Sequence, residues 1–442
     1  MARKDDDAPR PRAGDMSDPY RALRNRDFRL LLMGACISFF GQQMLAVAIG
    51  WELYTRTSSA LVLGGVGLAQ VIPVILLSLP AGYIADHYDR RRIMLFTQAT
   101  VAVGALLLAA LSAAKGSVSL IYACIALIGT AGAFNNPASS ALIGQVIPPD
   151  LYENAVTWRS SATQVSAIVG PAVGGLLIGV LGGATFVYLI YAVAALCFIA
   201  LLAQIRPRPQ ERPGGGGSGR TWRAVGEGLS FLWRTPVLLA AITLDLFAVL
   251  LGGAVTLLPI FAENILNVGP FGLGWLRAAG SIGAVLMAVV LARRPAFAHA
   301  GRTLLFAVAG FGVATIIFGL SRNFWLSFAM LFFIGAFDNV SVVIRSTLVL
   351  VRTPDAMRGR VGSVNSLFIS TSNQLGGFES GVTAQLFGPV AATVAGGIGT
   401  ILVVLLVGGL WPEMRNLRTL RDPPAEAEAE AEAEAATGAA SS

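Results

Sequence analysis

Charged side chains are scarce in this sequence. Of its 442 residues, 13% are charged and 55% are hydrophobic, whereas soluble domains carry about 25% charged residues. This shortage argues against a soluble multidomain enzyme. The net charge of +7 does not indicate nucleic-acid binding, because the basic residues interrupt long apolar runs and do not line one solvated face.

Cysteine and histidine are also rare. The three cysteines, Cys36, Cys124 and Cys197, fall in apolar runs, and the two histidines, His87 and His299, fall in connections between them. This distribution indicates neither a disulfide framework nor a metal site, and we expect no cofactor. The sequence also lacks the GxxxxGK[ST] pattern, which excludes ATP hydrolysis by a P-loop.

Long charge-free runs are abundant. They cover residues 93–114, 116–149, 160–205, 303–321 and 380–412, and about 20 apolar residues suffice to cross a bilayer as a helix. Continuous apolar runs favour helices over a β-barrel. The sequence therefore predicts an all-α polytopic membrane protein with twelve spans at 28–51, 60–83, 93–114, 119–143, 155–180, 184–204, 237–261, 271–292, 302–320, 323–349, 361–387 and 390–411.

The basic residues set the expected orientation. Most of the 32 Lys and Arg residues lie in the tails and in alternate connections, whereas the other connections hold Arg56, Lys115 and Arg322. Lys and Arg concentrate on the cytoplasmic side of membrane proteins. We therefore expect a multi-pass protein of the cytoplasmic membrane with both termini in the cytoplasm. The N-terminus reads as a polar tail and not as a cleavable signal.

The chain divides into two similar halves. A polar stretch at 206–235, rich in Pro and then Gly, reads as a flexible cytoplasmic linker between six-helix bundles at 28–205 and 236–412. The segment GAFNNP at 132–137 recurs as GAFDNV at 335–340, and duplicated halves are typical of transporters with a site between them. Residues 1–27 form an N-terminal tail, and residues 413–442 form an acidic low-complexity tail.

The connection GYIADHYDRRR at 82–92 resembles the signature between the second and third helices of the major facilitator superfamily. Gly82, Asp86, Arg90 and Arg91 match that signature, while His87 and Asp89 replace residues that are usual there. The resemblance implies the major facilitator fold of two pseudo-symmetric bundles, with a cytoplasmic latch that holds the outward-open state. The alternative is that the arginines act only as positive-inside anchors.

The segment VGPAVGGLL at 169–177 resembles the fifth-helix signature of antiporters in this superfamily. It predicts close, bendable packing at Gly170, Pro171, Gly174 and Gly175, because small residues let helices approach and Pro removes one backbone hydrogen bond. The resemblance favours export by exchange over uptake. Simple helix packing is the competing interpretation.

Three further segments resemble the exporter branch that includes enterobactin-type siderophore exporters and macrolide efflux pumps. They are YRALRNRDFRLLL at 20–32, PDAMRGRVGSVNSL at 354–367 and NQLGGFESGVTAQLFGP at 373–389. The resemblance implies a monomer that exports a lipophilic or amphiphilic small molecule by alternating access, with protons as the coupling ion. The arginine that proton-coupled drug exporters often carry early in span four is absent, which argues against a standard proton relay.

Ionisable residues inside the spans are costly and mark pathways or relays. Asp338 and then Asp245 are the candidate protonation sites, with a structural carboxylate as the alternative for each. Arg277 and Glu379 are predicted to form an ion pair in the outer half, and Arg345 to anchor the cytoplasmic end.

Neutral polar residues complete the predicted lining of a substrate site or hydrogen-bond neighbouring helices instead: Gln42, Gln43, Asn135, Asn136, Gln164, Asn339, Asn373 and Gln374. An uptake permease, a lipid flippase and a non-transporting sensor stay open as alternatives, whereas a membrane-embedded enzyme is disfavoured because the acids are scattered.

Overall fold

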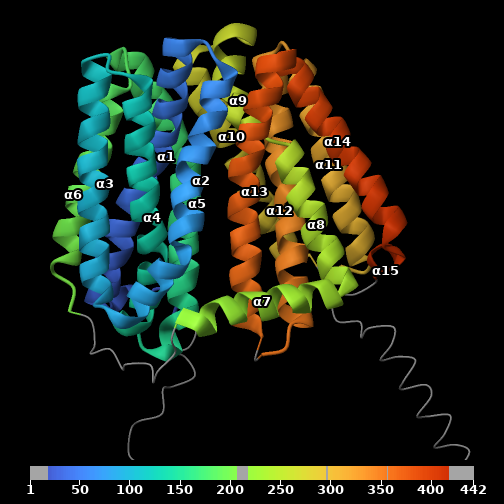
Figure 1. Ribbon diagram of the computed structural model, residues 1–442, viewed down its shortest axis with the longest axis horizontal. Coiled ribbons are helices and arrows are strands. Elements are labelled where there is room, and N and C mark those ends of the chain that lie inside the picture. The colour runs from blue at the N-terminus through green and yellow to red at the C-terminus, as the bar shows by residue number, and fades with distance from the viewer. Residues whose placement is uncertain (1–17, 207–217, 295–296, 356, 418–442) are drawn as a thin grey trace, which may run out of the picture.

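The computed structural model describes residues 18–206, 218–294, 297–355 and 357–417, and helices dominate that part of the chain (Figure 1). The first bundle contains α1 (Arg26–Thr57), α2 (Ala60–His87), α3 (Arg90–Ala113), α4 (Val118–Val146), α5 (Tyr152–Leu181) and α6 (Thr185–Leu202). The second contains α8 (Pro236–Leu251), α9 (Ala254–Ile260) with the π-helical turn η4 (Phe261–Ile265), α10 (Gly269–Ala292), α11 (Ala300–Leu320), α12 (Phe324–Arg352), α13 (Arg358–Phe387) and α14 (Pro389–Leu410).

We call the end of the bundles where α1 begins and α14 finishes the terminal face, and the opposite end the distal face. Eleven helical segments in the described part of the chain are long and apolar enough to cross a membrane, with Pro236–Ile265 counted as one. The remaining predicted span, 361–387, corresponds to α13, which has 30 residues but a more polar sequence and packs against α2 and α8. This arrangement confirms the all-helical, two-bundle fold.

Capping side chains mark where several of the helices begin. The Asn25 side chain accepts from the backbone N–H groups of Asp27 and Phe28 and starts α1 two residues before the predicted span. Ser59 and Asn323 cap α2 and α12 in the same way. A side-chain acceptor satisfies backbone donors that the first helical turn leaves free.

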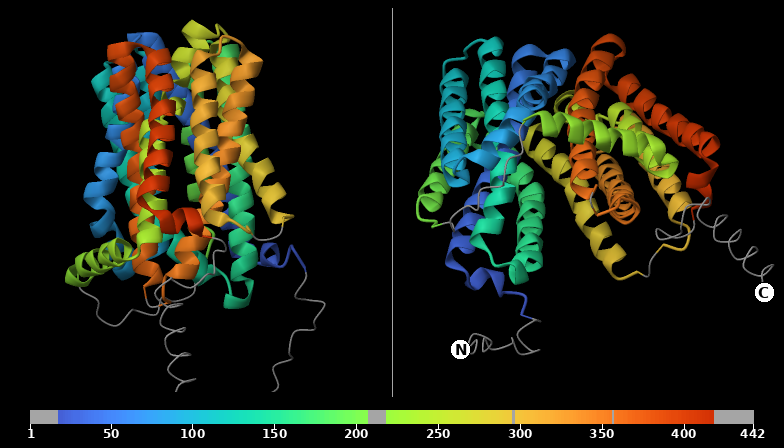
Figure 2. Two further views of the ribbon diagram at one scale, coloured as in Figure 1. Left: turned by 90° about the vertical axis from the view of Figure 1, so that its right-hand side faces the viewer. Right: turned by 60° about the horizontal axis from the view of Figure 1, so that its bottom comes forward.

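The linker prediction was wrong in part. The helix α7 (Ser218–Arg234) occupies most of the stretch that was predicted to be flexible, and it runs across the terminal face (Figure 2). Glu227 of α7 forms an ion pair with Arg360 of α13. The segment 207–217 lies outside the described residues.

Each predicted tail is described only where it meets the bundles. Residues 18–25 include the 3-10 turn η2 (Ala22–Arg24), and they pack near a second such turn, η3 (Pro149–Leu151), and the start of α5. There Arg21 pairs with Asp150, and Trp158 donates to the Pro19 carbonyl. At the other end, α15 (Pro412–Asn416) contacts α8 and α11. Residues 1–17 and 418–442, including the acidic repeat, lie outside the described part.

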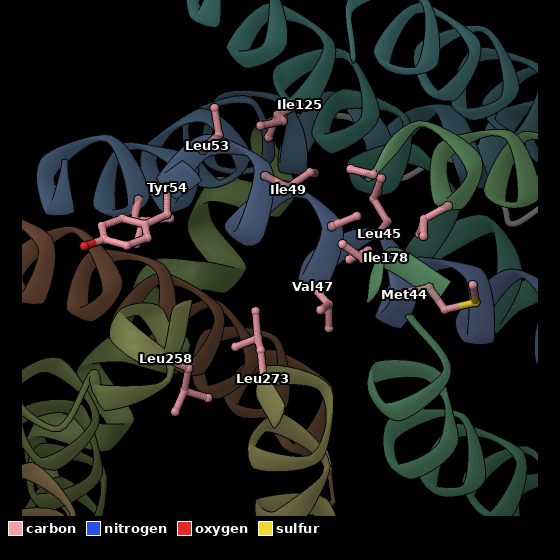
Figure 3. Packing of buried hydrophobic residues seen from close by; sticks show 14 of the residues in the cluster. Met44, Leu45, Val47, Ile49, Leu53, Tyr54, Ile125, Ile178, Leu258 and Leu273 are labelled. Carbon is pink, nitrogen blue, oxygen red and sulfur yellow. The ribbon is translucent and has the colours of Figure 1, made fainter. Parts of the chain in front are cut away.

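Buried apolar residues form one cluster that joins the halves and two that do not. The largest cluster combines α1 with α9 and α10, so that Val47 and Leu53 share a core with Leu258 and Leu273 (Figure 3). The other two clusters lie nearer the terminal face, one confined to each half. The halves are therefore fused at the distal side and separate toward the terminal side.

Two seams of small residues reinforce this distal closure. Along α5 and α10, a Cβ added at Gly175 would lie 2.3 Å from the Pro270 carbonyl oxygen and 2.9 Å from the Gly274 Cα. Along α2 and α13, a Cβ at Gly381 would lie 2.7 Å from the Gly64 Cα. Such contacts put one backbone directly against another, because small residues let helices approach.

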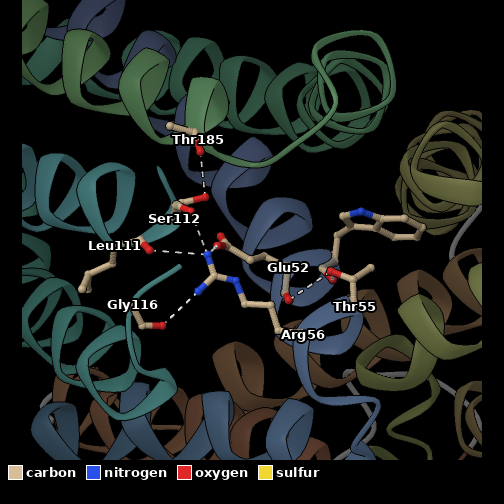
Figure 4. Close-up of polar contacts among 8 residues, drawn as sticks. Glu52, Thr55, Arg56, Leu111, Ser112, Gly116 and Thr185 are labelled. Carbon is tan, nitrogen blue, oxygen red and sulfur yellow. Dashed lines mark hydrogen bonds and ion pairs between the residues drawn. The ribbon is translucent and has the colours of Figure 1, made fainter. Parts of the chain in front are cut away.

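An ionic cluster fixes the distal end of the first bundle (Figure 4). Arg56 pairs with buried Glu52 and donates to the carbonyl groups of Leu111, Ser112 and Gly116 at the end of α3. The Leu111 and Ser112 carbonyls lie in the last turn of α3 and also accept from backbone N–H groups just beyond it, so the guanidinium adds further hydrogen bonds to the end of the helix. Arg56 therefore joins α1 to α3, although the sequence placed it in a connection.

Candidate transport site

A cavity of about 370 Å³ lies between the halves, immediately on the terminal side of the distal closure. Gln43 of α1 and Pro171 of α5 line it from the first half. The second half contributes most of the wall, from α8 to α13. Its lining is mainly apolar, which is typical of small-molecule sites with a few orienting polar groups.

Two charged side chains line this cavity, Asp338 of α12 and Arg277 of α10. Among the hydrogen bonds and ion pairs of the described residues, neither side chain has a partner, whereas Asn373 donates to the Ile369 carbonyl. Charges inside a membrane protein are costly unless they are paired or serve a pathway. These two groups are therefore the chemically distinctive features of the cavity.

A break in the seventh span forms part of the wall, and the sequence analysis missed it. The helix stops at Leu251 and restarts at Ala254, and Gly252 and Gly253 line the cavity. A Cβ at Gly253 would lie 2.4 Å from the Ser380 hydroxyl oxygen of α13. The Gly-Gly dipeptide was the available signal, because paired glycines interrupt helices and permit close packing.

A second cavity of about 170 Å³ adjoins the first on the distal side. Arg277 and Thr256 line both cavities, so they lie at the boundary. The Gln374 side chain of α13 lines the second cavity and donates to the Gln70 side chain of α2 at 3.0 Å. This bond crosses between the halves beside the α2–α13 seam.

Asp245 and Arg345 form a buried ion pair between α8 and α12. Their residues are 7% and 3% exposed. The prediction that Arg345 anchors the cytoplasmic end was therefore wrong. A void of about 10 Å³ touches both Asp245 and Asp338, which is about the space that one water molecule needs.

The predicted pair of Arg277 with Glu379 does not form in the described structure. The Glu379 carboxylate instead accepts from Ser380 and from Thr383 at 2.8 Å, both on its own helix. Arg277 faces the cavities, as described above. The similar depth predicted for the two residues does not bring their side chains together, because each has other neighbours.

The remaining predicted polar residues do not line these two cavities. Asn135 accepts from Thr97 of α3, and the Asn339 side-chain oxygen is buried without a hydrogen-bond partner among the described residues. Gln42 and Asn136 are exposed, and Gln164 is half-buried on α5. Of the eight neutral polar candidates, Gln43, Asn373 and Gln374 reach a cavity.

The glycines of the fifth-helix segment lie against two different helices. Gly170 packs on Gln43 and Gly174 on Met44, both of α1, whereas Gly175 packs on α10. The helix α5 is thus wedged between its own half and the other half. Any change in the angle between the halves must alter this contact.

The signature at 82–92 lies on the terminal face and makes contacts within the first half. Arg90 donates to the carbonyl groups of Ala85 and Ala141, and Arg91 donates to that of Leu202 at 2.9 Å. Asp86 is exposed, Gly82 is half-buried, and a Cβ at Gly82 would meet nothing within 4 Å.

Comparisons with known proteins extend over nearly the whole chain. Residues 17–430 match the family described as transmembrane secretion effector. The multidrug efflux pump Tap of Mycolicibacterium fortuitum is 26% identical over 89% of this chain and 98% of its own. The enterobactin exporter EntS of Shigella flexneri is 26% identical over 90% of this chain and 94% of its own.

Solved structures of transporters share the fold. A bacterial homologue of the human lysosomal transporter Spinster, in an inward-facing and unoccupied conformation, has a TM-score of 0.69 at 16% identity and covers 92% of this chain and 100% of its own. A POT family transporter has a TM-score of 0.68 at 11% identity, with 88% and 96% covered. The chain belongs to the transmembrane secretion effector family of the major facilitator superfamily and is a multi-pass secondary transporter that exports small molecules.

Proposed function

We propose that the protein is a monomeric proton antiporter of the cytoplasmic membrane that exports lipophilic or amphiphilic molecules by alternating access. The observation that carries this proposal is a cavity between the halves with a mainly apolar wall, in which the Asp338 carboxylate has no partner among the described residues. The terminal face is the cytoplasmic face, because most basic residues of the connections gather there. The distal seams then close the outer side of the site.

The lining supports a large apolar substrate with few hydrogen-bonding groups. Apart from the two charged residues, Gln43, Thr256, Ser281 and Asn373 are its polar side chains. Apolar area supplies affinity in such a pocket, while a few polar groups set orientation. A sugar would leave most of its hydroxyl groups without partners, which is costly in a buried site.

Asp338 is the proposed proton carrier. A buried carboxylate without a partner is costly to keep charged, so a proton and a cavity-bound substrate can exchange for one another as the halves rock. Asp245 and Arg345 both act electrostatically on Asp338, and the small void between the carboxylates offers a place for a bridging water. Asp245 itself is held by Arg345 and serves as the second group of this relay.

The segment 82–92 and the glycines of α5 are the proposed gating elements. In the distally closed structure, the arginines of the segment bind carbonyl groups of their own half. When the terminal side closes, α2 and α13 must approach there, and Asp86, Arg90 and Arg91 lie at that end of α2. Gly170, Pro171, Gly174 and Gly175 let α5 tilt against α1 and α10.

Asp338→Asn is expected to abolish export driven by a pH gradient. One proton that moves down a driving force equivalent to 100 mV supplies about 2.3 kcal/mol, which sustains roughly a 50-fold substrate gradient. Inverted vesicles that contain the variant should accumulate no dye above its equilibrium level, while exchange of labelled for unlabelled dye continues. Asp355→Asn removes an exposed carboxylate next to α13 and should accumulate dye normally. Full pH-driven accumulation by Asp338→Asn would contradict the assignment.

A further inference from the structure

Arg277 is a cation within a membrane-spanning helix, and the described residues supply no counter-ion for it. It projects from α10 at the boundary of the two cavities. Asp338 is the one other charged residue that lines either cavity. It forms no ion pair with Arg277 in the described part of the chain. A guanidinium stays charged in proteins and offers five N–H donors.

Three other acids of the spans are engaged with partners other than Arg277. Asp245 holds Arg345, Glu52 holds Arg56, and Glu379 accepts from the hydroxyl groups of its own helix. Arg277 therefore has no resident counter-ion among the described residues in this conformation. A half-buried cation at the wall of a substrate cavity, with no partner among the described residues, is suited to bind an anion.

We infer that Arg277 binds the anionic group of the substrate, so that the preferred substrates are amphiphilic organic acids with a carboxylate on an apolar body. This inference rests on the proposed export function and names its substrate class. A guanidinium matches a carboxylate with two parallel hydrogen bonds. The Thr256 hydroxyl lines both cavities with Arg277 and can donate a further bond, while the apolar body fills the larger cavity.

An anionic substrate also changes the charge that the proposed antiport moves. An anion moving out and a proton moving in both carry positive charge inward, so an acid would move two charges per turnover. A neutral analogue would move one.

The test uses a matched pair of fluorescent probes, 11-(dansylamino)undecanoic acid and its methyl ester, titrated against the purified full-length protein. The wild type should bind the acid at least tenfold more tightly than the ester. Arg277→Gln should weaken binding of the acid by about tenfold or more and change that of the ester by less than about twofold. Arg277→Lys keeps the charge but not the planar fork and should fall between.

The control and the contrary outcomes are defined by the same titration. Arg322→Gln removes an exposed arginine at the distal connection before α12 and should leave both affinities unchanged. Equal weakening of acid and ester by Arg277→Gln, or no preference for the acid in the wild type, would overturn the inference. If Arg277→Gln does not fold, the affinity of Arg277→Lys for the acid serves as the test. Weaker binding than that of the wild type supports the inference, whereas equal binding contradicts bidentate recognition.

The binding test is independent of proton coupling. If Asp338→Asn still transports with the pH gradient while the wild type prefers the acid through Arg277, the proton assignment fails and the anion site stands. If Asp338→Asn loses coupling while acid and ester bind alike, the anion site fails and the proposed antiport stands. The charge moved per turnover tests the proton assignment and the anion site together. We expect two charges for the acid and one for the ester.

Discussion

Replacing Arg345 with alanine is expected to destabilise the second bundle by about 3–5 kcal/mol, because the change leaves the Asp245 carboxylate buried without its counter-ion. Asp245 is 7% exposed and lies on a different helix from Arg345. Little water can therefore reach it to replace the lost partner. The loss should appear as a lower midpoint of thermal unfolding and a smaller monodisperse fraction of detergent-solubilised protein.

The double variant Asp245→Asn with Arg345→Gln separates a missing partner from a missing charge. It removes both charges and keeps similar side-chain volumes, so it should recover most of the lost stability. Arg358→Ala breaks an exposed pair with Asp355 and should cost less than about 1 kcal/mol. A double variant that is no more stable than Arg345→Ala would contradict this account of the pair.

This ion pair shows how much of the site the sequence could predict. The chain positions of Asp245 and Arg345 marked both as ionisable residues inside spans, and their depth in the membrane followed from the span boundaries. Depth does not determine which neighbour a side chain faces. The pair joins helices that are about 100 residues apart in the chain, and their relative rotation depends on packing across the whole bundle.

The error over Arg277 and Glu379 has the same physical origin. Both residues were predicted to lie in the outer half at similar depths, which suggested a pair, yet the Glu379 carboxylate accepts from Thr383 one helical turn along. Hydroxyl groups four residues away on the same helix are always within reach, whereas a distant guanidinium requires a particular helix rotation. Local partners of this kind compete with any pairing inferred from depth alone.

The fold itself was predictable because it depends on composition averaged over long segments. Twenty apolar residues in succession define a span whatever their order, and errors of a few residues at the ends do not change the topology. The linker helix α7 and the break at Gly252–Gly253 were not predictable in this way. Each involves a few residues whose conformation is settled by contacts with α13.

Gly175→Ala is expected to open the distal side of the transporter without unfolding either half. The added methyl group would lie 2.3 Å from a backbone carbonyl oxygen of Pro270, and no side-chain rotation can relieve a clash with a backbone. Overpacking costs typically 1–3 kcal/mol. The upper end applies here, so the balance between distally closed and distally open states should shift by roughly 100-fold.

The measurement is the accessibility of a cysteine in the second cavity. Ala46→Cys places a thiol in the wall of that cavity, in a protein whose native Cys36, Cys124 and Cys197 are replaced by alanine. A membrane-impermeant maleimide added from the distal side should label it at least tenfold faster when Gly175→Ala is present. Such a shift toward the distally open state would also slow export, because fewer molecules present the cavity to the terminal side.

Gly179→Ala is the matched control, one turn further along the same helix. Its added Cβ would meet its nearest neighbour, the Pro270 Cγ, at an ordinary contact distance of 3.7 Å, so labelling and export should equal those of the parent. Equal acceleration by both variants would mean that any added methyl group loosens α5. Unchanged labelling with Gly175→Ala would mean that the α5–α10 seam does not hold the distal side closed, and the closure would then depend on the α2–α13 seam and the shared apolar core.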